Sequence, residues 1–291
     1  MNHDPFIVPP GRNIRLRDYD PGYTGEFENK EAALLKLQED VRRLAEYQDV
    51  LYAQNTRALL VIFQAMDAAG KDSVIEHVMS GVNPQGCQVF SFKAPSAEEL
   101  DHDYLWRTQK ALPERGRIGI FNRSYYEEVL IVRVHPEILN QQQLPTEAKG
   151  HDIWKRRFEQ INNFERYLDE NGISVLKFFL NVSKAEQKSR FLKRIMTPEK
   201  NWKFSLTDVK ERGFWDQYME AYEDMFNHTS TEHAPWHIIP ADHKWFTRAA
   251  VADVIISKLQ SLRLSYPTVN EEHWQNLLKA KEILENEDRQ Q

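Results

Sequence analysis

ALLVIFQAMDAAGKDSVIEHVM, residues 58–79, is the stretch of sequence that decides the fold. Its first seven residues form a continuous run that is apolar up to the last residue, Gln64, which is typical of a β-strand covered on both faces. An Ala/Gly-rich turn follows at residues 65–70, and helical spacing of apolar residues resumes after it. A buried strand, a tight turn and a helix in this order predict an α/β protein.

The rest of the chain repeats this alternation. Further strands are predicted at 88–92, 117–121, 174–180 and 236–240, and helices at 31–55, 98–110, 153–170, 184–195, 213–228 and 247–262. Strands that alternate with helices of this length predict three layers, with a mainly parallel central sheet flanked by helices. Residues 1–30 are predicted to be an extended arm, 31–265 one folded domain, and 266–291 a polar C-terminal helix or tail.

Composition narrows the class of protein. The chain has 291 residues, a formal net charge of −6 and one cysteine, which excludes an intramolecular disulfide. The acidic balance argues against nucleic acid as a partner. No apolar run approaches the roughly 20 residues of a membrane-spanning helix, and the N-terminus lacks a signal-peptide pattern. We therefore expect no membrane contact and a cytoplasmic location.

The turn at 65–70 is close to a phosphate-binding motif, G-x4-G-K-[ST]. Gly70 and Lys71 match it, whereas Ala65 replaces the first glycine and Asp72 the final Ser/Thr. Backbone N–H groups where a helix begins bind anions, and a lysine there reaches phosphate oxygens. The sequence thus predicts phosphate binding by Lys71 together with the following loop and helix-start residues: Ala68, Ala69, Gly70, Asp72 and Ser73. The alternative is an ordinary strand–turn–helix with a lysine in the turn.

Two carboxylates, Asp67 and Asp72, flank this turn. They would repel a phosphate unless they held a cation, and Mg²⁺ prefers oxygen ligands beside phosphates. We therefore predict that Asp67 and Asp72 are metal ligands for Mg²⁺, or for Mn²⁺ in its place. For Asp72 the alternative is an acid that stabilises the first turn of a helix by about 0.3–1 kcal/mol.

A second group of polar residues follows the strand predicted at 117–121. Ligands bind at the carboxyl ends of parallel strands, where Asn122 and Arg123 stand. The planar fork of Arg123 suits a phosphate, and Arg133 is a further candidate from a helix predicted at 125–134. The Asn122 amide could hold a metal-bound water or a phosphate. A salt bridge is the alternative for each arginine.

The runs Met66-Asp-Ala-Ala-Gly-Lys-Asp72 and Asn122-Arg-Ser-Tyr-Tyr-Glu-Glu128, with a basic segment at 190–203, resemble the family-2 polyphosphate kinases from about residue 10 to 265. That resemblance implies a P-loop kinase fold related to thymidylate kinase. It also implies reversible, Mg²⁺-dependent transfer of phosphate from inorganic polyphosphate to nucleotides. Glu127 resembles the branch that phosphorylates both AMP and ADP, giving ATP in two steps. A surface-helix acid is the favoured alternative for Glu127.

The segment 184–212 holds nine basic and four acidic residues, a local excess of five positive charges. It follows the strand at 174–180, where kinases of this fold carry a mobile lid that closes over phosphates. Arg190, Lys193 and Arg194 share one helix face by their spacing, which predicts a phosphate-facing set. Lys200 and Lys203 extend it. The alternative is a solvated charged face.

The predicted roles divide into two sets. Expected catalytic residues are Asp67, Lys71, Arg123, Arg190 and Arg194; expected substrate-binding residues are Ala68, Ala69, Gly70, Asp72, Ser73, Asn122, Glu127, Arg133, Lys193, Lys200 and Lys203. The expected partners are AMP, ADP, ATP, inorganic polyphosphate and further copies of the chain, as a dimer or tetramer. An ATP-dependent nucleoside monophosphate kinase and a non-catalytic nucleotide- or polyphosphate-binding protein remain the alternative functions.

Overall fold

The central sheet has five strands, and every adjacent pair among them is parallel. The computed structural model describes residues 1–25, 27–150, 152–202 and 204–287. The strands are β1 (Ala58–Gln64), β2 (Cys87–Ser91), β3 (Ile118–Asn122), β4 (Ile173–Asn181) and β5 (Trp236–Pro240), in the order β2-β3-β1-β4-β5. All seven residues of β1 are buried, as the apolar run predicted. The α/β fold with a parallel sheet is confirmed.

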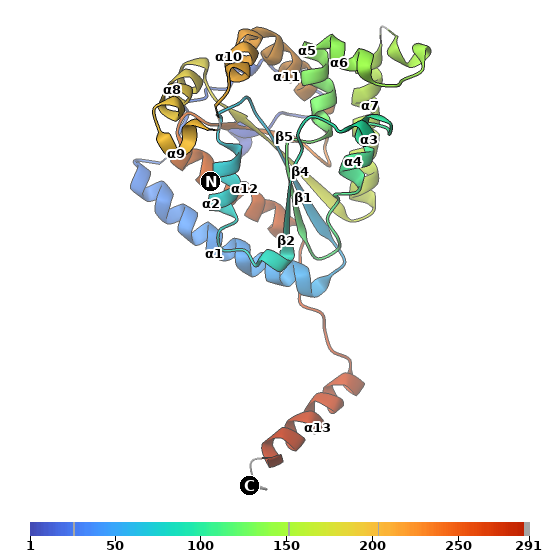
Figure 1. Ribbon diagram of the computed structural model, residues 1–291. Coiled ribbons are helices and arrows are strands. Elements are labelled where there is room, and N and C mark those ends of the chain that lie inside the picture. Colours follow the sequence, from blue (N-terminus) through green and yellow to red (C-terminus); the bar gives the residue numbers. More distant parts are fainter. Residues whose placement is uncertain (26, 151, 203, 288–291) are drawn as a thin grey trace.

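Helices cover both faces of this sheet (Figure 1). On one side α1 (Lys30–Gln54) and α2 (Lys71–Val78) pack against α12 (Lys244–Ser261). On the other, α7 (Ile153–Glu170) packs on β4 and contacts α11 (Trp215–Thr229). The lid segment forms α8 (Lys184–Ile195), α9 (Pro198–Asn201) and α10 (Leu206–Gly213) near the end of the sheet where β1 leads into α2 (Figure 1). The sheet and the helices on its two faces therefore form three layers that share one hydrophobic core.

The remaining elements are short or lie apart from the core. They are α3 (Ala97–Leu100), α4 (Trp106–Gln109), α5 (Ile131–Val134), α6 (Pro136–Gln141) and the 3-10 helices η1 (Asp4–Phe6), η2 (Leu16–Asp18), η3 (Pro84–Gly86), η4 (Tyr125–Val129) and η5 (Thr146–Lys149). The C-terminal α13 (Glu271–Glu287) buries no residue and extends away from the body (Figure 1). Among the described residues, each helix is too short or too polar to cross a membrane.

Two predicted helices are wrong in detail. The helix expected at 98–110 is broken into α3 and α4, because Asp103 accepts a hydrogen bond from the Leu105 N–H (2.9 Å) and starts a new turn. The helix expected at 125–134 is the 3-10 turn η4 followed by α5. There the Ser124 hydroxyl accepts from the Tyr126 N–H (3.2 Å), which tightens the turn after β3.

The N-terminal arm packs on the body. The Val8 N–H donates to the Trp236 carbonyl of β5 (2.9 Å), and the Leu16 N–H donates to Glu223 Oε2 on α11 (2.8 Å). The Phe6 ring is buried and meets the rings of Tyr23 and Phe246 edge to face. These contacts make the arm part of the hydrophobic core, although its backbone is largely irregular.

A buried ion pair fixes the turn after β3. Lys177 of β4 donates to Glu165 Oε2 of α7 (2.6 Å), and both side chains are fully buried. Glu165 Oε1 accepts from the hydroxyls of Tyr125 (2.9 Å) and Tyr126 (2.7 Å). Burial lowers the pKa of Lys177, with Glu165 opposing that shift. The two tyrosines of η4 are thereby held against α7.

Replacing Lys177 with methionine should destabilise the protein by about 3–5 kcal/mol, because it leaves the Glu165 carboxylate buried without its cation. Urea unfolding measures this change in the free energy of unfolding. Lys155→Met on the exposed side of α7 is the matched control and should change it by less than about 0.5 kcal/mol. Combining Lys177→Met with Glu165→Gln should recover part of the loss. A single variant as stable as the control would contradict the role of this pair.

Candidate active site

The turn between β1 and α2 has the backbone shape of a phosphate-binding loop. Gly70 is the N-cap of α2 with φ +111°, and Ala68 has φ +61°, a left-handed conformation that a non-glycine residue adopts at a cost of about 1–2 kcal/mol. The Ala69 N–H closes the turn on the Met66 carbonyl (3.3 Å). Lys71 is buried, and its ammonium donates to the Ala65 carbonyl (2.8 Å).

The end of β3 is joined to this loop by two hydrogen bonds. Arg123, with φ +65°, donates through its guanidinium group to Asp67 Oδ1 (2.9 Å), and its N–H donates to the Phe63 carbonyl of β1 (3.0 Å). Asn122 donates through its amide to Asp72 Oδ1 (2.6 Å). Both predicted metal ligands are thus beside residues of the second predicted motif. These residues, 56 and 50 positions apart in sequence, meet because β1 and β3 are neighbours in the sheet.

Glu127 lies inside the site, and its interpretation as a surface-helix acid is wrong. Its side chain lines a cavity of about 380 Å³ together with Asp67 and Arg123. With the Gln64 amide oriented to suit its partners, Gln64 donates to Glu127 Oε1 (2.8 Å) and accepts from the Ser124 N–H (3.1 Å). Burial raises the pKa of Glu127, and the positive charges of Arg123 and Lys71 oppose the rise. The 3-10 turn, which replaces the predicted helix, directs this side chain inward.

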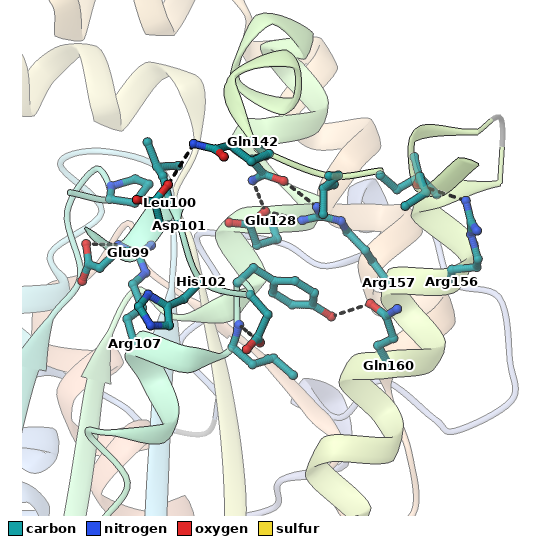
Figure 2. A pocket seen from close by; sticks show the side chains of 18 residues that line it. Glu99, Leu100, Asp101, His102, Arg107, Glu128, Gln142, Arg156, Arg157 and Gln160 are labelled. Carbon is teal, nitrogen blue, oxygen red and sulfur yellow. Dashed lines mark hydrogen bonds and ion pairs between the residues drawn. The ribbon is translucent and has the colours of Figure 1, made fainter. Parts of the chain in front are cut away.

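A second cavity of about 490 Å³ adjoins the first, since both are lined by Pro95, Leu100, Arg107 and Glu128. Its centre holds Glu128, which pairs with the buried Arg157 of α7 and accepts from the Gln142 amide (2.8 Å) (Figure 2). Arg157 also donates to Gln142 Oε1 (2.7 Å) and lies 4.7 Å from the Tyr104 ring centre. Spacing within one segment does not identify Arg157 as a site residue, because its partner Glu128 is 29 residues away in the chain.

The basic side chains of the lid segment, predicted to face a phosphate together, differ in their exposure and their contacts. Lys193 and Lys200 are exposed, and Arg194 is half-buried with its guanidinium carbon 5.9 Å from the Phe191 ring centre. Arg190 instead is buried and donates to backbone carbonyls of the loop and of the β5–α12 connection. It points inward because α8 packs this side of the helix against the loop. Lys203 lies outside the described residues.

Two basic residues that the sequence did not single out join this region from α12. Arg248 donates to the Ser73 hydroxyl (2.7 Å), so Ser73 is engaged by a side chain of α12. Burial lowers the pKa of Lys244, and the neighbouring charges of Arg190, Arg248, Lys200 and Lys193 lower it further. These four positive charges therefore act on Lys244, and such a concentration of positive charge favours an anionic ligand nearby.

Arg133 makes an ion pair with Asp224 of α11, which is the alternative described for it. It is absent from the lining of both cavities, whereas its neighbours Ile131 and Val132 line the smaller one. Contact of Arg133 with a substrate stays a prediction. The same holds for the other substrate and metal roles.

If the chain transfers phosphate as its sequence predicts, the rate of that transfer should fall as the pH rises through about 8. The reason is that burial and the nearby Arg123 lower the pKa of Lys71 to about 8. The ammonium is present below that pH and is lost above it. A plot of kcat/KM against pH for the phosphate donor checks this. A bound polyanion favours the charged form, so kcat should decline at a higher pH than kcat/KM. Lys71→Arg is the control, since a guanidinium stays charged; an unchanged alkaline decline in this variant would assign it to another group.

The fold and the site together define an α/β protein of the P-loop kinase architecture. The family model described as Polyphosphate kinase 2 matches residues 26–266, and the chain belongs to that family. It is 52% identical over 280 residues to an ADP-polyphosphate phosphotransferase of Rhodopseudomonas palustris, covering 96% of this chain and 97% of the relative. It is 44% identical over 263 residues to an AMP/ADP-polyphosphate phosphotransferase of Meiothermus ruber, covering 90% and 94%.

A solved structure supports the same assignment. The crystal structure of polyphosphate kinase 2 from Arthrobacter aurescens TC1 superposes with a TM-score of 0.85 at 39% identity, covering 94% of this chain and 95% of that one. The resemblance predicted from the two sequence motifs and the basic segment is thereby confirmed.

Proposed function

We propose that this chain transfers the terminal phosphate of inorganic polyphosphate to AMP and to ADP, so that AMP is converted to ATP in two steps. The observation that carries the proposal is the group of charged side chains around the loop. Arg123, Asp67 and Glu127 line the cavity, and the Lys71 ammonium interacts electrostatically with all three. Family membership and the names of the two relatives support polyphosphate as donor and adenine nucleotides as acceptors.

The acceptor nucleotide is proposed to occupy the two adjoining cavities. Its phosphate would lie near Arg123 in the smaller cavity, and its nucleoside would extend toward Glu128 and Arg157 in the larger one. Polyphosphate is proposed to reach the loop past Lys193, Lys200, Lys244 and Arg248, none of which lines either cavity. The two substrates would then meet at the loop from different sides, as direct transfer requires.

Mg²⁺ is proposed as the metal, held by Asp67 and Asp72. Among the described residues there is no group of three or more His, Cys, Asp or Glu side chains that could hold an ion by themselves. The two carboxylates of Asp67 and Asp72 fit Mg²⁺, which typically takes one or two carboxylates and completes its shell with waters and phosphate oxygens. When bound, the ion would neutralise charge on the phosphates. Mn²⁺ could replace it, since it shares the preference for oxygen ligands.

The residues of the chain have distinct roles in the proposed reaction. An oxygen of the acceptor phosphate attacks the terminal phosphorus of polyphosphate. The bond from that phosphorus to the bridging oxygen that it shares with the penultimate phosphorus breaks, and this oxygen leaves as the new end of a chain shorter by one phosphate. Lys71, Arg123 and Arg194 would stabilise the negative charge on the transferred group, which is spread over its equatorial oxygens. Asp67 would keep the Arg123 fork oriented. The same contacts serve the reverse reaction.

The test uses purified protein, Mg²⁺ and polyphosphate with no ATP, and supplies AMP, ADP or GDP as separate acceptors. ADP and ATP should form from AMP, and ATP should form from ADP. The separate arms are needed because the Rhodopseudomonas relative is named for ADP alone and the Meiothermus relative for both. Product from ADP alone would restrict the acceptor to ADP. No product in any arm would refute the proposal. A further arm with AMP and ATP but no polyphosphate tests the alternative, and transfer to AMP in that arm alone would favour an ATP-dependent kinase.

We further propose a cytoplasmic homo-oligomer, a dimer or tetramer. Light scattering of the protein after size-exclusion chromatography measures its mass against the 34.4 kDa chain. A mass equal to one chain at micromolar concentration would exclude the oligomer.

A further inference from the structure

Every N–H donor of the Arg190 guanidinium group is used within the protein. Nε donates to Glu186 Oε1 one turn earlier on α8 (2.8 Å). One terminal nitrogen donates to the carbonyls of Ala68 (3.1 Å) and Ala69 (2.6 Å), and the other to those of Ala241 (2.6 Å) and Asp242 (3.1 Å). An arginine has five N–H donors, so these five bonds leave none for a phosphate.

The four carbonyls belong to two segments that contribute residues to the site, so their relative position determines its shape. Residues 68 and 69 form the loop between β1 and α2, and residues 241 and 242 connect β5 to α12, which carries Lys244 and Arg248. Arg190 itself is on α8, the first helix of the lid segment. One buried side chain therefore joins the loop, the lid and the basic end of α12.

Arg190 also sets the direction of a backbone amide in the loop. A trans peptide is planar, so its N–H points opposite to the carbonyl of the preceding residue. The bond from Arg190 to the Ala69 carbonyl thus turns the Gly70 N–H away from Arg190. The bond to the Ala68 carbonyl likewise fixes the preceding peptide plane, whose Ala69 N–H donates to the Met66 carbonyl within the turn. Ala68, whose carbonyl accepts one of these bonds, has a left-handed conformation (φ +61°).

We propose that Arg190 is a positioning residue, which holds the turn and its Gly70 amide in their binding orientation and joins the loop to the lid, and that it does not bind phosphate. This differs from the phosphate-facing role that its spacing with Lys193 and Arg194 predicted. The inference rests on the proposed function where kcat is measured, since kcat requires that the protein transfers phosphate. The measurement of the Kd of polyphosphate requires only that the protein binds polyphosphate.

The experiment compares Arg190→Ala and Arg190→Lys with Arg194→Ala, and uses Arg166→Ala on the exposed side of α7 as the control. For each variant, kcat with saturating substrates and the Kd of polyphosphate over a range of salt concentrations are measured. A lost phosphate contact lowers the slope of log Kd against log salt by about 0.7, the value for a flexible single-stranded polyanion. Arg194→Ala should show that loss, and Arg190→Ala should keep the parental slope while kcat falls about 10²-fold.

The lysine variant makes the inference testable even where Arg190→Ala folds poorly. A lysine keeps the positive charge but cannot reach carbonyls in two directions, so Arg190→Lys should be as impaired in kcat as Arg190→Ala. Guanidinium chloride added to Arg190→Ala should restore part of kcat, whereas sodium chloride at equal ionic strength should not. Thermal unfolding of each variant verifies that the protein is folded under the assay conditions.

The outcomes separate the two proposals. An Arg190→Lys variant with nearly parental kcat, or an Arg190→Ala variant whose salt slope falls as in Arg194→Ala, would overturn the positioning role and make Arg190 a phosphate ligand. A parent protein that binds polyphosphate without transferring it would refute the proposed function and leave the salt-slope comparison valid.

Discussion

Replacement of Lys71 by methionine is expected to lower polyphosphate-dependent ATP formation by about 10²–10³-fold. Lys71 is a buried cation against the loop backbone, where its ammonium donates to the Ala65 carbonyl. In a loose transition state almost all catalysis comes from positioning and charge neutralisation, and one such contact typically contributes 10²–10³-fold. Initial rates of ATP formation from ADP at saturating polyphosphate measure the effect.

The stability of this variant gives a second expected result. The pKa of Lys71 is lowered to about 8 in the folded protein from an ordinary value of 10.5, so burial disfavours its charged form at neutral pH. Methionine keeps the length of the side chain without that charge, and the Tm at pH 7 should therefore be unchanged or higher. Lys279→Met on the exposed α13 is the control and should alter neither quantity. Retention of more than a tenth of the activity in Lys71→Met would show that Lys71 is not central to transfer.

Replacement of Asp67 by asparagine is the second change with a large expected effect, about 10²–10³-fold in kcat. The amide oxygen can still accept the Arg123 hydrogen bond that Asp67 Oδ1 now accepts at 2.9 Å, so the shape of the site is retained. What is lost is one of the two carboxylates proposed to hold Mg²⁺. The Mg²⁺ concentration that gives half-maximal rate should consequently rise.

The informative measurement is a Mg²⁺ titration of the rate at fixed polyphosphate and ADP. Asp216→Asn, on the exposed first turn of α11, serves as the control because it removes an acid outside the lining of both cavities. If Asp67→Asn lowered kcat without moving the Mg²⁺ midpoint, the carboxylate would act only through Arg123. In that case Asp72 would become the principal candidate for the metal.

Much of this fold could be predicted from short-range patterns. The run 58–64 is apolar at every position except its last residue, and it forms a strand buried on both faces. Residues 184–195 were predicted as a helix and form α8 with the same bounds, because Ser183 caps its N-terminus and Pro198 prevents its extension. Where apolar spacing was interrupted by acids, as at Asp101 and Asp103, the pattern predicted one helix and the structure has two short ones.

The candidate site could be predicted only in part. Asp67, Lys71, Asn122 and Arg123 were identified because a turn after a buried strand, and polar residues at a strand end, have local signatures. Lys244, Arg248 and Arg157 were not identified, since they are helix residues without a local signature. They enter the site because α12 packs beside α2 and α7 beside β4.

The sequence alone determined the residue types and the backbone plan: strand, loop, helix, a second polar strand end and a basic segment after β4. These follow from periodicity and turn chemistry, which act over a few residues. Only the tertiary structure decided where side chains point. Glu127, for which a surface-helix acid was the favoured alternative to substrate binding, lies in the cavity because η4 is a 3-10 turn. Arg190, predicted to face phosphate, faces four backbone carbonyls. A side chain's partners depend on packing between distant segments, which helical spacing within one segment does not encode.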